Sequence, residues 1–190
     1  MKNIVIFGAP GCGKGTQSER LIDKFGFYHI STGEVLRDHI ARGTELGKIA
    51  DTYISKGQLI PDELMLDILS NLLDSEAVAG KSIIFDGFPR TVRQAEELER
   101  ILRERDRQVD TVIGLEVADE MLVERLINRG KETGRADDNL DTIKHRLEVY
   151  HNQTQPLQEF YTNNGLYKAI DGSKTVDAIA DQIALEIERI

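Results

Sequence analysis

The sequence has very little cysteine: Cys12 is the only one in 190 residues. A single cysteine can form neither a disulfide within the chain nor a zinc site built from several cysteines. We therefore expect a reducing, cytoplasmic setting and no zinc. The sequence also lacks an apolar stretch long enough to cross a bilayer, and the apolar run 4–7 is too short for the core of a signal peptide. Membrane association is not expected.

Positive charge is scarce as well. The chain has 24 Lys and Arg residues against 33 Asp and Glu residues, which gives a net charge of −9. General affinity for nucleic acids or anionic membranes draws on an excess of Lys and Arg. The charge balance argues against both kinds of partner, so any anion that this protein binds must be captured locally.

What the sequence does contain is a glycine-rich segment at 8–16, Gly-Ala-Pro-Gly-Cys-Gly-Lys-Gly-Thr, directly after the apolar run. Its glycines leave backbone N–H groups open to wrap a polyphosphate, and Lys14 adds a positive charge for the β- and γ-phosphates. The following helix would direct its positive dipole end toward the same anion. The segment could be only a strand-to-helix connection, but strand, spacing, lysine and helix together favour a phosphate-binding loop (P-loop). Gly15 stands where a Ser or Thr usually follows the lysine, and the hydroxyl comes one residue later, at Thr16. Whether Thr16 binds Mg²⁺ directly is therefore an open question at this point.

Further apolar runs at 83–85, 112–117 and 166–170, and a shorter one at 28–30, are separated by segments with helical spacing. Strands that alternate with helices form parallel sheets covered on both faces. The sequence therefore predicts one α/β domain over residues 1–190, a three-layer sandwich around a five-stranded parallel sheet. A chain of this length buries about 70% of its unfolded surface, which is enough for a real core.

Two inserts interrupt this alternation. Residues 31–60 have helical spacing and begin with Ser31-Thr32-Gly33-Glu34, which predicts a capping box and a small lobe beside the sheet. Residues 128–138 are polar, hinged by glycines, and expected to be irregular. Helices are expected on both sides of this second insert, at 120–129 and at 140–160.

Asp86 directly follows the apolar run 83–85. Ligands of open parallel sheets bind at the carboxyl ends of the strands. Asp86 is therefore expected to orient Mg²⁺ and its water molecules near the phosphates. An aspartate that caps a turn is the simpler interpretation when Asp86 is taken alone, and the P-loop favours the metal role.

Arginines form a second group of candidate residues near strand ends, helix ends and the 128–138 insert: Arg37, Arg90, Arg125, Arg129, Arg135 and Arg146. A guanidinium group grips phosphate oxygens and spreads the charge of a transferring phosphoryl group. Taken singly, each arginine is better explained by a solvated helix face or an ordinary salt bridge, as we expect for the arginines of residues 96–107.

Gln94 and the histidines have competing interpretations. Thr91 and Gln94 have capping-box spacing, so Gln94 could cap a helix, read a base, or do both. The four histidines, including His29, show no spacing typical of a metal site, and surface or core positions are expected for them.

Four segments taken together closely resemble the adenylate kinase family: 8–16, Ser-Thr-Gly-Glu-Val-Leu-Arg at 31–37, Gly-Gln-Leu-Ile-Pro-Asp at 57–62, and Asp-Gly-Phe-Pro-Arg at 86–90. Gly-Arg-Ala-Asp-Asp at 134–138, Arg146, Tyr150 and Asp-Gly-Ser-Lys at 171–174 match later motifs of that family in order, so the resemblance covers essentially the full chain. It implies reversible transfer of the γ-phosphoryl group of Mg·ATP to AMP, giving two ADP. It also implies that 31–60 binds the nucleoside monophosphate (NMP) and that 128–138 is a lid of the short form, which carries no zinc.

The resemblance further implies the residues that bind each nucleotide. ATP would be held by Gly11, Cys12, Gly13, Lys14, Gly15 and Thr16, with Arg129 and the backbone from Gly172 to Lys174 near its adenine. AMP would be held by Thr32, Arg37, Gln58, Leu59, Ile60, Gly87, Phe88, Pro89, Arg90 and Gln94, the last at the adenine edge. The catalytic group around the phosphates would be Lys14, Arg90, Arg125, Arg129, Arg135 and Arg146, of which Arg135 and Arg146 also face AMP.

Phosphoryl transfer relies on alignment and electrostatic stabilisation, so neither a general base nor a covalent intermediate is expected. Water competes with AMP as the acceptor, so both inserts should close over the nucleotides. Asp137 and Asp138 would help to hold the closed lid through partner cations. A protein that opens and closes around two nucleotides is expected to work as a monomer.

Two other functions share parts of this pattern. An NMP kinase with UMP or CMP as acceptor would use the same phosphate machinery, although Thr32 and Gln94 favour AMP. A GTPase-like switch would use the P-loop to set its conformation, but the sequence has no Asn-Lys-x-Asp segment to read guanine and supplies its own arginines. Rapid turnover with AMP would separate a kinase from a switch.

Overall fold

The computed structural model describes residues 1–190, and a five-stranded parallel sheet with strand order β2-β3-β1-β4-β5 forms its centre. The strands are β1 (Asn3–Phe7), β2 (Tyr28–Ser31), β3 (Ile83–Asp86), β4 (Thr111–Glu116) and β5 (Tyr167–Asp171). In the register, Ile4 of β1 pairs with Ile84 on one side and with Thr111 on the other. The five expected strands and their parallel arrangement are confirmed.

Helices cover both faces of the sheet, and alternate residues of β1 serve the two resulting cores. Val5 and Phe7 pack with α4 (Asp62–Leu73), α5 (Val92–Arg103) and α8 (Pro156–Asn163) in a cluster of 21 buried residues. Ile4 and Ile6 pack with α1 (Lys14–Phe25) and α9 (Val176–Glu188) in a cluster of 17. Successive side chains of a strand point to opposite faces, so this apolar run suits a strand that is buried on both sides.

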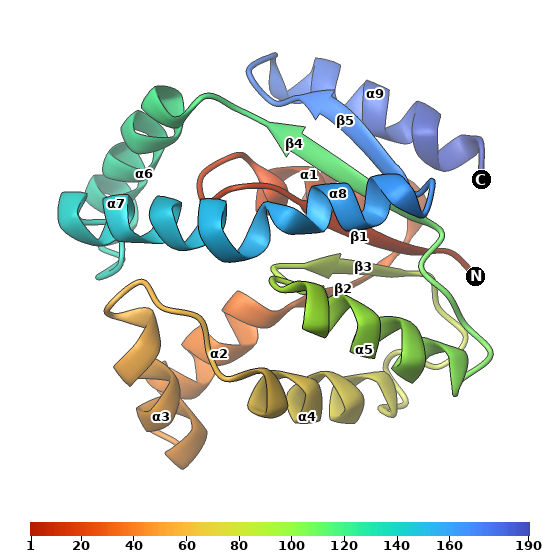
Figure 1. Ribbon diagram of the computed structural model, residues 1–190, viewed down its shortest axis with the longest axis horizontal. Helices are drawn as coiled ribbons and strands as arrows, with labels where there is room; N and C mark the ends of the chain where they lie inside the picture. Colours follow the sequence, from red (N-terminus) through yellow and green to blue (C-terminus); the bar gives the residue numbers. More distant parts are fainter.

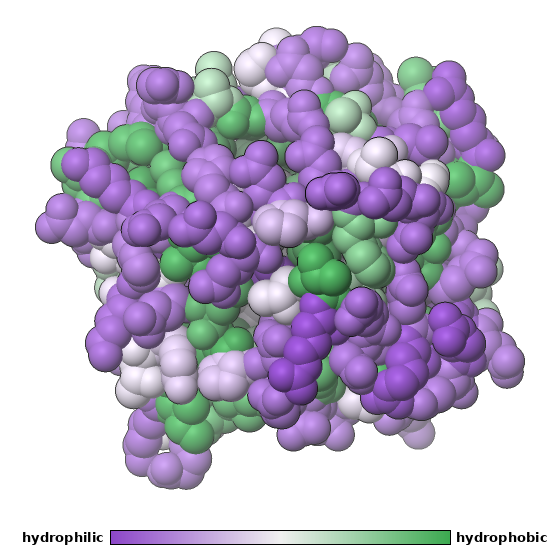
Figure 2. Space-filling view, in the orientation of Figure 1, coloured by the Kyte–Doolittle hydropathy of each residue, from purple (hydrophilic) through white to green (hydrophobic).

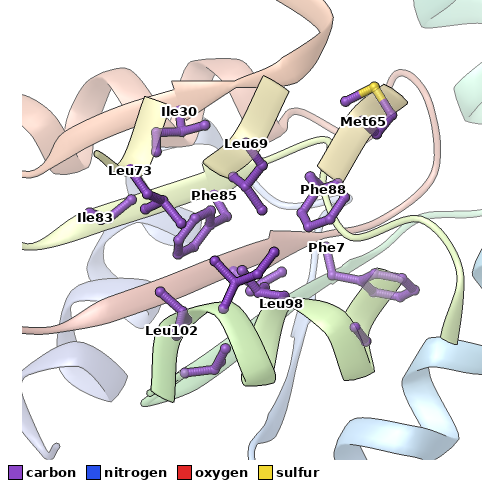
Figure 3. Packing of buried hydrophobic residues seen from close by; sticks show 14 of the residues in the cluster. Phe7, Ile30, Met65, Leu69, Leu73, Ile83, Phe85, Phe88, Leu98 and Leu102 are labelled. Carbon is purple, nitrogen blue, oxygen red and sulfur yellow. The ribbon is translucent and has the colours of Figure 1, made fainter. Parts of the chain in front are cut away.

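The first of these cores is densely built from large side chains. In Figure 3, Leu69 and Leu73 of α4 and Leu98 and Leu102 of α5 approach Phe85 from opposite sides. Burying one such side chain contributes about 1.5–3 kcal/mol. The outer surface differs, because hydrophilic side chains cover most of the face in Figure 2. No helix combines the length and apolar character needed to cross a membrane.

The remaining helices lie at the end of the sheet to which the arrowheads of β3, β4 and β5 point (Figure 1). They are α2 (Thr32–Ala41), α3 (Glu45–Ile54), α6 (Asp119–Thr133) and α7 (Leu140–Val149), and a π-helical turn, η1 (Tyr150–Thr154), continues α7. The two sequence inserts therefore flank the carboxyl ends of the parallel strands.

Three local expectations were wrong. Ser31 is the N-cap of α2, but its side chain makes no capping bond, because this residue is also the end of β2, in register with Asp86. The 128–138 insert is not irregular throughout, since α6 continues to Thr133 and ends where Gly134 adopts a left-handed conformation. The helix expected at 140–160 is divided into α7, η1 and α8, and Pro156 stands in the first turn of α8, where its missing N–H is tolerated.

Candidate active site

A cavity of about 440 Å³ lies at the carboxyl ends of β1, β2 and β3, between the two inserts. Most of the residues predicted from the sequence line it: Gly11, Gly13, Lys14, Gly15, Thr16, Thr32, Arg37, Gln58, Leu59, Ile60, Asp86, Gly87, Phe88, Pro89, Arg90, Gln94, Arg125, Arg129, Arg135 and Arg146. Cys12, Gly172 and Lys174 are the predicted residues that lie outside it. The lining also includes Tyr150 and Asp137, to which the sequence analysis gave no direct ligand contact.

The glycine-rich segment forms a tight loop between β1 and α1. A Cβ atom on Gly8 would lie 2.6 Å from Cys12 Sγ and 2.8 Å from the carbonyl oxygen of Leu115, so only glycine fits. Gly13 caps α1 with a φ of 106°, in a region that L side chains rarely adopt. Lys14 folds back across the loop, and its Nζ donates to the carbonyl oxygens of Gly8 (2.8 Å) and Ala9 (3.0 Å).

The loop is connected to the segment 171–174 by Arg125 of α6. Its two terminal nitrogens donate to the carbonyl oxygens of Cys12 (3.4 Å) and Gly172 (3.1 Å), and the N–H of Gly172 donates to the carbonyl oxygen of Glu116. The side chain of Cys12 is buried beneath the loop, with 1% of the residue exposed. Arg125 therefore places Gly172 beside the P-loop, although neither Gly172 nor Lys174 reaches the cavity.

On the other side of the cavity, the carbonyl oxygen of Gly87 accepts hydrogen bonds from two side chains. It accepts from Arg90 Nε over 2.6 Å and from Thr32 Oγ1 over 3.0 Å, which joins the start of α2 to the turn after β3. Burial, reinforced by the nearby charge of Arg146, lowers the pKa of Arg90 to about 10. Burial and the charge of Arg135 likewise lower the pKa of Arg37. A bound anion would relieve this crowding of positive charge.

Two aspartates of the 128–138 insert bind two of the predicted catalytic arginines. The carboxylate of Asp138, whose side chain is fully buried, accepts from Nε (2.6 Å) and NH2 (2.8 Å) of Arg129 and from NH1 of Arg146 (2.8 Å). Asp137 pairs with Arg146 over 2.9 Å. Burial raises the pKa of Asp138, but the bonds and charges of Arg129 and Arg146 outweigh it and leave that pKa below its usual value. Both aspartates therefore have partner cations, and that they hold the insert closed stays a prediction.

Asp86 stands at the carboxyl end of β3, next to a histidine that the sequence analysis left without a role. Nε2 of His29 lies 3.3 Å from Oδ2 of Asp86. Burial raises the pKa of Asp86, but the hydrogen bond with His29 and the charge of Lys14 outweigh it, so the pKa lies below its usual value. An ionised carboxylate can coordinate Mg²⁺ or accept hydrogen bonds from its water molecules, so this residue fits the metal. No sequence signal pointed to His29, because the pairing of β2 with β3 is not readable from spacing.

Gln94 has the predicted position in a helix cap, with one difference. Oγ1 of Thr91 accepts from the N–H of Gln94, as in a capping box. The side-chain Oε1 of Gln94, however, accepts from the N–H of Arg90, one residue before the cap. Gln94 is buried and lines the cavity, as do the apolar residues Ile60 and Met65.

A phosphate loop at a helix N-terminus, facing six arginines from three helices and two connecting segments around one cavity, defines a phosphotransferase of the P-loop class. A family model described as adenylate kinase matches residues 6–166. The adenylate kinases of Phocaeicola vulgatus and Bacteroides thetaiotaomicron are 57% and 56% identical to this chain over 190 residues, which is 100% of each protein. That of Porphyromonas gingivalis is 51% identical over 189 residues, covering 100% of this chain and 97% of its own. The chain belongs to the adenylate kinase family, and it is a phosphotransferase of the nucleoside monophosphate kinase type.

Proposed function

We propose that the chain transfers the γ-phosphoryl group of Mg·ATP to AMP and that the two nucleotides meet in the cavity at the carboxyl ends of β1, β2 and β3. ATP would lie on residues 11–16 and AMP on the side formed by Thr32, Arg37, residues 58–60, residues 87–90 and Gln94. The observation that carries this proposal is the convergence of Lys14 and six arginines on one cavity of a chain whose net charge is −9. Such a concentration of positive charge favours polyphosphate ligands.

The residues would act by alignment and electrostatics. Lys14 would leave the carbonyl oxygens of Gly8 and Ala9 and turn toward the phosphates, while Arg90 and Arg37 would hold the phosphate of AMP. Arg129 and Arg146, now paired with Asp138, would share their remaining N–H groups with the transferring phosphoryl group. No side chain needs to abstract a proton, because in-line phosphoryl transfer depends chiefly on position and charge.

Magnesium would enter with ATP. Asp86 would hold the ion through its water molecules, and the hydroxyl of the exposed Thr16 would be an alternative ligand. When bound, Mg²⁺ offsets the negative charge of the phosphate oxygens. His29 would keep the Asp86 carboxylate ionised and oriented for this contact.

The lobe at 31–60 and the lid at 128–138 would close over the substrates and exclude water, which would otherwise accept the phosphoryl group. Because the lobe and the lid must open and close around two nucleotides, a monomer is the expected working unit. A cytoplasmic location fits the single buried cysteine and the substrates.

The experiment is a coupled assay of ADP formation with Mg·ATP and, in parallel, AMP, UMP, CMP, GMP or no acceptor. Fast turnover confined to AMP is the expected result. Preference for UMP or CMP would leave the mechanism in place and overturn the acceptor. Slow hydrolysis that needs no acceptor would overturn the kinase function and favour a nucleotide switch.

A further inference from the structure

A carboxylate outside the cavity holds the amide of Gln94. Gln94 lies in the first turn of α5, is 1% exposed and lines the cavity. Its Nε2 donates to Oδ1 of Asp62 over 2.7 Å, and its Oε1 accepts from the N–H of Arg90 over 2.7 Å. Asp62 is the first residue of α4 and does not line the cavity. It therefore reaches any ligand only through Gln94.

These two bonds determine which way the amide faces. A side-chain amide has two N–H donors and two acceptor positions, so one of each remains available to the cavity. Rotating the amide by half a turn would set its oxygen against the carboxylate of Asp62 and its NH2 group against the N–H of Arg90. Neither contact can form a hydrogen bond, and an unsatisfied buried polar group is costly. The second oxygen of Asp62 accepts from Oγ1 of Thr91 over 3.4 Å, which restrains the carboxylate itself.

We propose that Asp62 is a positioning residue that sets which purine the acceptor site takes, an inference that rests on the proposed function. The adenine edge presents an acceptor at N1 and a donor at its 6-amino group. A 6-oxopurine such as hypoxanthine presents the reverse order, a donor at N1 and an acceptor at O6. Because the sugar phosphate of the acceptor is anchored elsewhere, an amide held in one orientation matches only one of these edges. Asp62 thus makes Gln94 select AMP over IMP.

The test substitutes Asp62→Asn in the full-length chain and compares AMP with IMP as acceptors for Mg·ATP. Asparagine has the same shape but both a donor and an acceptor, so it can bond Gln94 in either orientation. The ratio of kcat/KM for AMP to that for IMP should fall at least about tenfold, through a higher KM for AMP and better use of IMP. The kcat with AMP should change less than about threefold, because Asp62 touches no phosphate-binding group.

Two further variants separate this role from a general effect of charge or folding. Glu63→Gln removes the same charge from the next residue of α4, whose partner is Arg93 on the surface, and should leave the ratio unchanged. Asp62→Glu keeps the negative charge at the N-terminus of α4 but moves the carboxylate by one methylene group. It should lower the ratio in the same direction, and it provides the test if Asp62→Asn does not fold.

The outcomes distinguish this proposal from the function on which it rests. A native enzyme that uses AMP and IMP equally well would overturn the assignment of AMP as acceptor, and the role of Asp62 with it. A native enzyme that prefers AMP, with an unchanged ratio in both Asp62 variants, would overturn the role of Asp62 alone. An equal loss of selectivity in Glu63→Gln would also overturn this role. Any negative charge near the start of α4 would then be enough to favour AMP over IMP.

Discussion

Replacing Asp138 with asparagine should destabilise the protein by about 3 kcal/mol, because its buried carboxylate is the only ion-pair partner of Arg129 and its loss leaves that charge uncompensated. The structure provides the reason for this size. The fully buried carboxylate accepts two bonds from Arg129 and one from Arg146. Asparagine keeps one acceptor but loses the charge and sets an NH2 group against one of the arginines. For a chain of 190 residues, each kcal/mol changes Tm by about 2–4 °C, so Tm should fall by about 6–12 °C.

The loss of stability in Asp138→Asn should be smaller when nucleotides are bound. If Arg129 and Arg146 meet phosphate groups in the complex, bound ATP and AMP supply the negative charge that the variant lacks. Thermal unfolding with saturating nucleotides should therefore show a smaller gap in Tm between the native chain and Asp138→Asn than unfolding without them. The exposed Asp141 lies in the first turn of α7 and has no ion pair, so Asp141→Asn is the matched control, with an expected change of about 0.5 kcal/mol or less.

The difference in Tm between the native chain and Asp138→Asn should disappear at low pH and persist at neutral pH. Because the pKa of Asp138 is lower in the folded chain than its usual value, its contribution to stability is complete above the unfolded pKa of about 3.9. It is lost as the pH falls through the still lower folded pKa. The gap should be constant from pH 5 to pH 8 and close only below about pH 4. A Tm within 1 °C of the native value, about a third of a kcal/mol, would refute the argument from burial and pairing.

Three further predictions concern the cavity. Arg90→Ala should lower kcat by about 10²–10³-fold while the free energy of unfolding, measured with urea, changes by about 1 kcal/mol or less; an unchanged kcat would remove Arg90 from the site. His29→Gln removes a group that lowers the pKa of Asp86. The acid limb of the pH profile of kcat/KM for ATP should therefore move to higher pH. A limb that stays in place would mean that the ionisation of Asp86 does not control the reaction. A Cβ atom on Gly15 would meet nothing within 4 Å, so Gly15→Ala should stabilise α1 by about 0.5–1 kcal/mol. The same methyl group should obstruct a phosphate that approaches the loop and so raise the KM for ATP. An unchanged KM would mean that no phosphate approaches this residue.

The sequence predicted the layers of the fold because its signals are local. Short, mostly apolar runs of three to six residues predicted the strands, and all five proved correct. The strands β1 and β3 are buried along their whole length, whereas β5 is largely exposed. The P-loop could be read in the same way, because its pattern of glycines and lysine is local. In the structure Gly8 has no room for a Cβ atom, since Cys12 and Leu115 lie too close. Local signals were less reliable at the ends of elements. Ser31 has the spacing of a capping box, but it is the last residue of β2 and its side chain makes no capping bond.

Contacts between segments far apart in the sequence could not be predicted in this way. His29 meets Asp86 because β2 happens to be the neighbour of β3, and nothing in the spacing of either strand states that order. The bond from Gln94 to Asp62 joins the first turns of two helices that are 32 residues apart. Arg125 spans 113 residues to reach the carbonyl oxygen of Cys12. Each of these contacts needs the packed sheet and helices to exist first.

The amino-acid sequence by itself determined the class of the protein, its phosphate loop and the set of charged residues around it, because periodicity, glycine spacing and residue type act over a few neighbouring positions. The tertiary structure alone decided how those charges are paired. Asp138 holds Arg129 and Arg146, His29 bonds Asp86, and Asp62 orients Gln94. Hydrogen bonds and ion pairs act over about 3 Å, so their partners are settled only when distant segments are packed against one another.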